Sequence, residues 1–168
     1  MKKALIVVLV VIAGVVGYWL ISPLFVDVVV QEGLPTGTGY DLPAGAPVAE
    51  PILLATGTFT DADGSHHGSG TVNVIRVGRQ EYLRFEDNFS VTNGPDLFVY
   101  LGKEREVHPA LQLGELKGNQ GSQNYVIPID ASILDTNQVI IWCKAFNVNF
   151  SIADLKLVVP QGEYLKGE

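Results

Sequence analysis

The chain has one side chain suited to thiol chemistry, Cys143, which is the only cysteine among 168 residues. A single cysteine excludes an internal disulfide bond and a zinc site built from several cysteines. Three roles remain: a small buried core residue, a redox-active thiol, and a copper ligand. Burial is the commonest fate of a free cysteine, whereas a redox thiol needs solvent access and a nearby positive charge. Lys144 is the only cation next to Cys143 in the sequence.

A copper site would also need imidazole ligands, and the histidines of the chain are His66, His67 and His108. Neighbouring residues on a strand point to opposite faces, so His66 and His67 could share one ion only in a loop. The polar composition of residues 61–68 predicts such a loop, and His67 and Cys143 are the candidate metal ligands. Copper and haem are considered as cofactors, but neither has a complete set of ligands. A solvated loop without a site is the simpler interpretation.

No arrangement typical of a known catalytic site is present, so the sequence leaves enzymatic activity undecided. Ser69 lies between two glycines but lacks the spacing of a nucleophile elbow. The run 118–121 begins and ends with glycine, but no lysine followed by serine or threonine comes after it, as a phosphate-binding loop requires.

The charge of the chain argues against nucleic acid as a partner. The formal net charge is −7, and apart from Lys2 and Lys3 the chain carries nine basic against eighteen acidic side chains. Binding to phosphates needs a basic patch, and the arginines and lysines here are scattered and outnumbered.

The amino-terminal segment predicts a membrane anchor. Residues 4–26 contain no charged side chain, and a helix of this length would be about 35 Å long, enough to cross a hydrocarbon core of about 30 Å. Lys2 and Lys3 place the amino terminus in the cytoplasm by the positive-inside rule. We therefore expect residues 1–30 to form a cytoplasmic end and a single transmembrane helix in the cell membrane, with an extracytoplasmic domain behind it. A cleaved secretory signal is the alternative, although the apolar run is long for one.

The stretch 31–51 is rich in proline and glycine and shows no regular period, so we expect a linker that lets the domain reorient or that acts only as a spacer. Residues 52–160 alternate short apolar runs with turn signals, and no helical period is visible. About eight short strands at this spacing predict an all-β fold, an antiparallel β-sandwich. Residues 161–168 form a tail.

The run 139–146 predicts the strand that positions the thiol. Regular alternation after Phe146 places Phe146 and Phe150 on one face of the following strand. The same parity, followed backwards, groups Trp142 with these phenylalanines and turns Cys143 to the opposite face beside Val139 and Ile141. This projection assumes that no β-bulge intervenes near Lys144.

Several motifs, taken in order along residues 57–157, resemble the DM-thirteen domain family. The most specific are the Asn93-Gly94-Pro95-Asp96 turn, the Lys117-Gly118-Asn119-Gln120-Gly121 loop and the Trp142-Cys143 pair. Others are Gly57-Thr58-Phe59, His67-Gly68-Ser69-Gly70-Thr71-Val72, Leu83-Arg84-Phe85-Glu86-Asp87-Asn88-Phe89 and Tyr125-Val126-Ile127-Pro128.

The resemblance implies an extracytoplasmic β-sandwich that acts in electron transfer, with Cys143 as its redox-active residue. Larger relatives carry cytochrome-like or haem-binding modules beside this domain, so a separate redox partner protein is expected here. Our leading hypothesis is electron transfer or thiol redox chemistry through Cys143. The alternative is a non-catalytic surface module that binds a protein or a small ligand.

Overall fold

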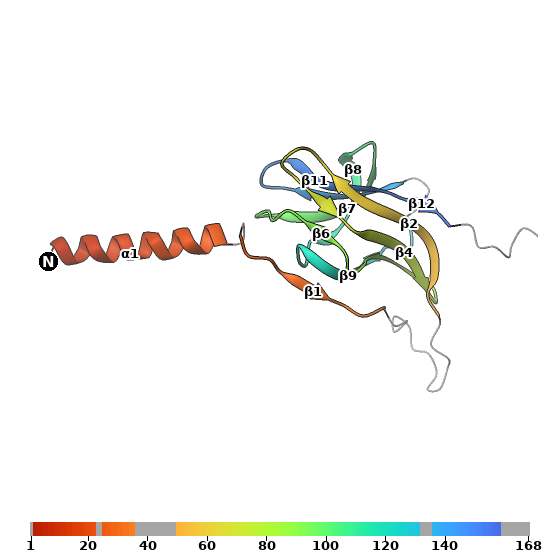
Figure 1. Cartoon of the computed structure of the whole chain (residues 1–168), viewed down its shortest axis with the longest axis horizontal. Coiled ribbons are helices and arrows are strands. Elements are labelled where there is room, and N and C mark those ends of the chain that lie inside the picture. Colours follow the sequence, from red (N-terminus) through yellow and green to blue (C-terminus); the bar gives the residue numbers. More distant parts are fainter. Residues whose placement is uncertain (1, 23–24, 36–49, 132–135, 159–168) are drawn as a thin grey trace, which may run out of the picture.

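The computed structural model describes residues 2–22, 25–35, 50–131 and 136–158. Its one helix, α1 (Lys2–Ile21), extends away from a domain made of strands (Figure 1). A search of the described residues for a helix with the length and hydropathy needed to cross a membrane found none. The structure does not confirm the transmembrane anchor, which stays a prediction from the sequence.

Twelve strands are present in the described part of the chain, so the expected number of about eight is corrected. Several strands of two or three residues are too short to produce a visible alternation in sequence. The strands are β1 (Val29–Gln31), β2 (Ile52–Asp61), β3 (Gly68–Ser69), β4 (Thr71–Val77), β5 (Gln80–Phe85), β6 (Ser90–Val91), β7 (Leu97–Lys103), β8 (Glu106–Glu115), β9 (Gln120–Ile127), β10 (Gln138–Cys143), β11 (Val148–Asp154) and β12 (Lys156–Leu157).

The strands form two layers joined through β2, and the predicted all-β antiparallel fold is confirmed. Hydrogen bonding follows the order β3-β6-β9-β5-β4-β2-β11-β10-β7-β8. The first part of β2 pairs with β4, while its last three residues, 59–61, pair with β11. This long strand therefore passes from one layer of the sandwich into the other (Figure 1).

The main core lies between the two layers and is apolar. Residues from β2, β5, β9 and the loop before β6 contribute a group of aromatic rings in contact, Phe59, Phe85, Phe89 and Tyr125. β7 and β10 contribute alternate residues, among them Leu101 and Ile141, which are fully buried. Burial of these side chains is the main term that stabilises the sandwich.

The side chains of β10 lie on the two faces that were predicted, but Phe150 of β11 lies on the face opposite to its predicted one. Val139, Ile141 and Cys143 point into the main core, while Trp142 lies on the outer face in a smaller cluster that includes Phe98, Tyr100, Ile140 and Ile152. Phe150 packs in the main core with Cys143 rather than with Trp142.

The reason is a bulge in the pairing of β10 with β11. Ile141 pairs with Ser151 and Trp142 pairs with Asn149, so Phe150 has no direct partner on β10. The extra residue reverses the face on which the side chains of β11 lie relative to those of β10. Phe146 is 57% exposed in the turn between the two strands and packs in neither cluster.

The first residues after α1 lie on the domain. β1 pairs in parallel with β9, Val29 opposite Gln120 and Gln31 opposite Ser122. The predicted linker therefore begins in a docked strand. Most of that linker, residues 36–49, and the predicted tail 161–168 lie outside the described residues.

Candidate functional site

Cys143 is the last residue of β10 and is fully buried. It lies opposite Leu97 of β7 and Val148 of β11, and its side chain belongs to the main apolar core. A thiol with no exposed surface cannot be reached by another protein's disulfide bond in this conformation. Any chemistry at Cys143 therefore requires a local opening of the structure.

Lys144, the one cation next to Cys143 in the sequence, points elsewhere. The ammonium group of Lys144 lies 5.3 Å from the ring centre of Phe98, which belongs to the outer cluster. The thiol of Cys143 lies on the other face of the same sheet. The backbone N–H of Lys144 donates to the carbonyl of Asp96 at 2.9 Å and ties the end of β10 to the 93–96 turn.

Two loops cover the end of the core that holds Cys143. At Gly94, an added Cβ would come within 2.8 Å of the side chains of both Leu97 and Phe150, so a larger residue would require these core side chains to shift. The imidazole of His66 lies against the ring of Phe150, with 4.2 Å between the ring centres. The 93–96 turn and the 61–67 loop therefore lie over core residues that neighbour the thiol.

The two adjacent histidines have separate carboxylate partners. Nδ1 of His66 lies 2.7 Å from Oδ2 of Asp63, and Nδ1 of His67 lies 3.1 Å from Oδ2 of Asp61. The hydrogen bond with His66, followed by one from the backbone N–H of Ser65, lowers the pKa of Asp63 to about 2. The hydrogen bond with His67 likewise lowers the pKa of Asp61, with help from the N–H of Gly68.

These residues do not assemble a metal site with Cys143. His67 is exposed on its loop, Cys143 is buried, and His108 lies on β8, its ring centre 6.2 Å from that of Trp142. Among the residues whose placement is described, no three histidine, cysteine or acidic side chains converge as metal ligands. The side chains present do not fit a copper site.

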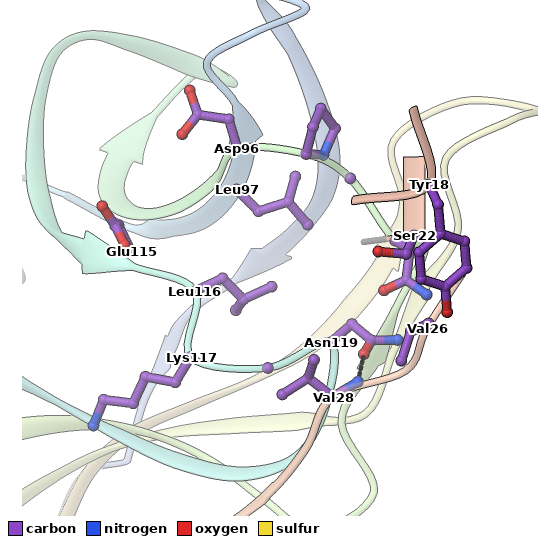
Figure 2. Close-up of a pocket in the computed structure, with 14 residues that line it drawn as sticks. Tyr18, Ser22, Val26, Val28, Asp96, Leu97, Glu115, Leu116, Lys117 and Asn119 are labelled. Carbon is purple, nitrogen blue, oxygen red and sulfur yellow. Dashed lines mark hydrogen bonds between the residues drawn. The ribbon is translucent and has the colours of Figure 1, made fainter. Parts of the chain in front are cut away.

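A cleft lined by both polar and apolar side chains lies beside the start of β7 (Figure 2). Its volume is about 480 Å³, and its walls come from the end of α1, from the 93–97 turn and from residues 115–119. Asp96 and Glu115 bring negative charge to it, while Lys117 extends away from Asp96 (Figure 2). Leu97 lines the cleft and is also the residue opposite Cys143 on β7. A molecule bound in this cleft would therefore contact Leu97, which is the residue paired with Cys143.

The sequence pointed to these loops but not to their role. The 93–96 turn and the 117–121 loop are its most specific motifs, and the structure brings them together at the cleft. Asp96, Glu115 and Asn119 were not predicted as site residues. One signal in the sequence could have found them. The 93–96 turn and the 117–121 loop both contain glycine and lack a repeating apolar pattern, and loops of this kind often carry binding residues.

The class of protein that fold and site define is thus a two-layer β domain with one buried thiol, whose strand partner Leu97 lines a cleft. Residues 58–155 match the model of the family described as Electron transfer DM13, which covers more than half of the chain. The chain belongs to this family, and the predicted resemblance is confirmed. Searches of curated proteins and of solved structures each found no match.

Proposed function

We propose that this domain transfers electrons through Cys143 to a partner that docks at this cleft. The observation that carries the proposal is the position of Leu97, which joins the cleft to the strand end bearing the only thiol of an electron-transfer family member. Membership of the family supports a redox role in general, and the chemistry of cysteine supports this residue.

The proposed step is thiol–disulfide exchange after the 144–147 turn opens. The Cys143 thiolate attacks one sulfur of a disulfide bond in the partner; a new sulfur–sulfur bond forms, the partner's bond breaks, and the departing sulfur takes up the proton that Cys143 lost. A donor dithiol then reduces the mixed disulfide, becomes a disulfide itself, and returns Cys143 and the partner sulfur to thiols. The net change is the transfer of two electrons and two protons from the dithiol to the partner.

The position of Cys143 at the end of its strand favours this route. Residues 144–147 form an exposed turn, and to free the thiol the pairs with Leu97 and Val148 and the hydrogen bond from Lys144 to Asp96 must separate. Local openings at strand ends cost less free energy than global unfolding. The rate of reaction would then follow the population of the open form.

The proposal includes the cellular location. We place the domain outside the cytoplasm, tethered by the uncharged run 4–26, which rests on the length of that run and on Lys2 and Lys3. In cells expressing the full chain, protease added from outside should remove the domain without lysis. Protection of the domain from that protease would contradict this placement.

The decisive experiment compares wild type with Cys143→Ala in the full chain. We expect the native thiol to react slowly with an aromatic disulfide reagent, to react at once in denaturant, and to catalyse exchange between a dithiol and a disulfide substrate. Cys143→Ala should retain the fold, as judged by circular dichroism, and lose the exchange activity. Equal exchange rates for the two proteins would exclude Cys143 as the redox group.

A second function is supported by the cleft itself. Asp96 and Glu115 would attract a cationic group, and this attraction does not depend on Cys143. In this case the domain is a non-catalytic module that binds a protein or a small ligand at the cell surface. Binding by Cys143→Ala together with loss of binding by Asp96→Asn would favour this function over electron transfer.

A further inference from the structure

The segment Asp27–Gly33, here called the arm, is held on the domain by a set of contacts outside the main core. The N–H of Gln120 donates to the carbonyl of Val28 at 3.3 Å, and the N–H of Glu32 donates to the carbonyl of Ser122 at 2.9 Å. Together with β1 these bonds make the arm an added parallel strand at β9. The receiving surface on β9 and its neighbouring loops is called the groove.

One end of the arm is recognised by two asparagines. Oδ1 of Asn119 accepts the N–H of Val28 at 2.6 Å (dashed in Figure 2), and its Nδ2 donates to Oδ1 of Asp27 at 2.8 Å. Nδ2 of Asn93 donates to the same carboxylate oxygen at 2.9 Å. An aspartate at this position is therefore bound by side chains of two family motifs.

The other end is recognised through Glu32. Its carboxylate accepts from Nζ of Lys117 at 2.7 Å and from the N–H of Asn124 at 2.7 Å. Arg84, which is 8% exposed, donates to the carbonyls of Glu32 and Gly33 at 3.1 Å each. The groove thus binds an extended strand with two acidic side chains, Asp27 and Glu32, five positions apart.

The glycines of the 117–121 loop make room for the strand. A Cβ on Gly118 would collide with the carbonyl oxygen of Val28, and one on Gly121 would collide with that of Val30. Every groove residue named above lies within the matched region 58–155, whereas the arm lies before it. The binding site for the arm therefore lies inside the matched region, and the arm itself lies outside it.

We propose that the groove is a strand-acceptor site and that the arm of a second copy of this chain can fill it, so that two copies exchange arms. The second copy is the partner because it carries the same acidic strand that the groove reads. Residues 34–51 connect the arm to β2, and eighteen residues can span up to about 60 Å when extended, enough to reach a neighbouring molecule. A closed pair repeats each arm–groove contact, so exchange loses none of them.

The Lys117–Glu32 ion pair provides the test, because a carbodiimide can convert it into a covalent amide. Two full-length variants, Glu32→Gln and Lys117→Met, are co-expressed with different tags, purified together in detergent and cross-linked. Only arm exchange can bring Lys117 of the first variant to Glu32 of the second. Wild type and each variant alone serve as controls, with thermal melting to verify folding.

We expect a covalent dimer in the co-expressed sample, with the Lys117–Glu32 linkage identified by peptide mass spectrometry, and no such linkage in either variant alone. A within-chain linkage in wild type with none between the two variants would show that the arm binds only its own domain and would overturn the proposal. Absence of the linkage in wild type as well would overturn it too, because the arm would then not occupy the groove.

Discussion

The main core and the groove are both formed by strands of one sandwich, but opposite kinds of contact hold them. The core around Cys143 is apolar and is stabilised by the removal of side chains from water. The groove is polar, and its hydrogen bonds and one ion pair each contribute little in net free energy. Among the described residues no buried side-chain nitrogen or oxygen lacks a partner. The core therefore supplies most of the stability of the domain, whereas the contacts of the groove hold the arm on it.

The largest expected effect comes from a cavity in the core beside the thiol. Ile141→Ala should lower the free energy of unfolding by about 2–5 kcal/mol, because it removes a fully buried side chain from a packed layer. Chemical denaturation measures the change. Ile129→Ala, at a side chain that is 72% exposed, is the matched control and should change it by less than about 0.5 kcal/mol. Similar losses in both variants would mean that the layer around Ile141 is not closely packed.

A smaller loss is expected from a polar atom at the thiol position. Cys143→Ser places a hydroxyl group in the apolar core and should cost about 1–3 kcal/mol of unfolding free energy. Cys143→Ala, which adds no polar group, should cost less, so alanine is the better variant for redox assays. If serine proves as stable as the wild type, the position must have access to water or to a polar partner.

In the groove, Gly118→Ala should release the arm while leaving the domain folded. Its methyl group would collide with the carbonyl of Val28, and about 1 kcal/mol of stability should be lost with each of the hydrogen bonds that break. Hydrogen exchange at the amides of Glu32 and Gln120 should become faster. Gly64→Ala, at a position with open space around it, should leave both amides protected. Unchanged exchange in Gly118→Ala would contradict the close approach.

The smallest effect concerns the pH dependence of arm binding. Burial acts to raise the pKa of Glu32, but hydrogen bonds from Lys117 and Asn124 outweigh it, and the pKa is lowered from its ordinary value of 4.5. Because the pKa of Glu32 is lower in the folded state than in the unfolded state, its carboxylate stabilises the folded state above pH 4.5. This stabilisation is lost as the pH falls below that value and through the lowered pKa. Because the ion pair is partly exposed, we expect less than about 1 kcal/mol.

Glu32→Gln should remove this component, so that arm protection no longer changes between pH 5 and pH 3. Hydrogen exchange of the arm at both pH values measures it. A variant whose protection still falls with that of the wild type would show that Glu32 is not the source of the pH dependence.

Much of the fold could be predicted from local pattern alone. Alternation with a period of two identified the all-β class and the faces of β10, since side-chain direction along a regular strand depends only on parity. Parity failed at Phe150, where a bulge in the pairing with β10 turned the side chain into the main core. A bulge depends on how two strands match, and neither strand alone specifies it.

The site was predicted less well than the fold. Lys144 was the only local cation that a redox thiol could have used, but its position after the strand end lets it turn to Phe98 on the outer face. The stretch from residue 31 was expected to be a linker because proline and glycine follow closely, yet its first residues complete the docked arm. The length of the apolar run in 139–146 could not distinguish a buried thiol from an accessible one.

The sequence by itself determined the class of fold, the family and the presence of a single thiol, because composition, alternation and motifs are properties of neighbouring residues. Only the tertiary structure decided that the thiol is buried and that Asn119 binds Asp27, ninety-two positions earlier in the chain. Contacts over such separations depend on how strands are ordered within the sheets. That order is set by the packing of the whole domain rather than by any local pattern.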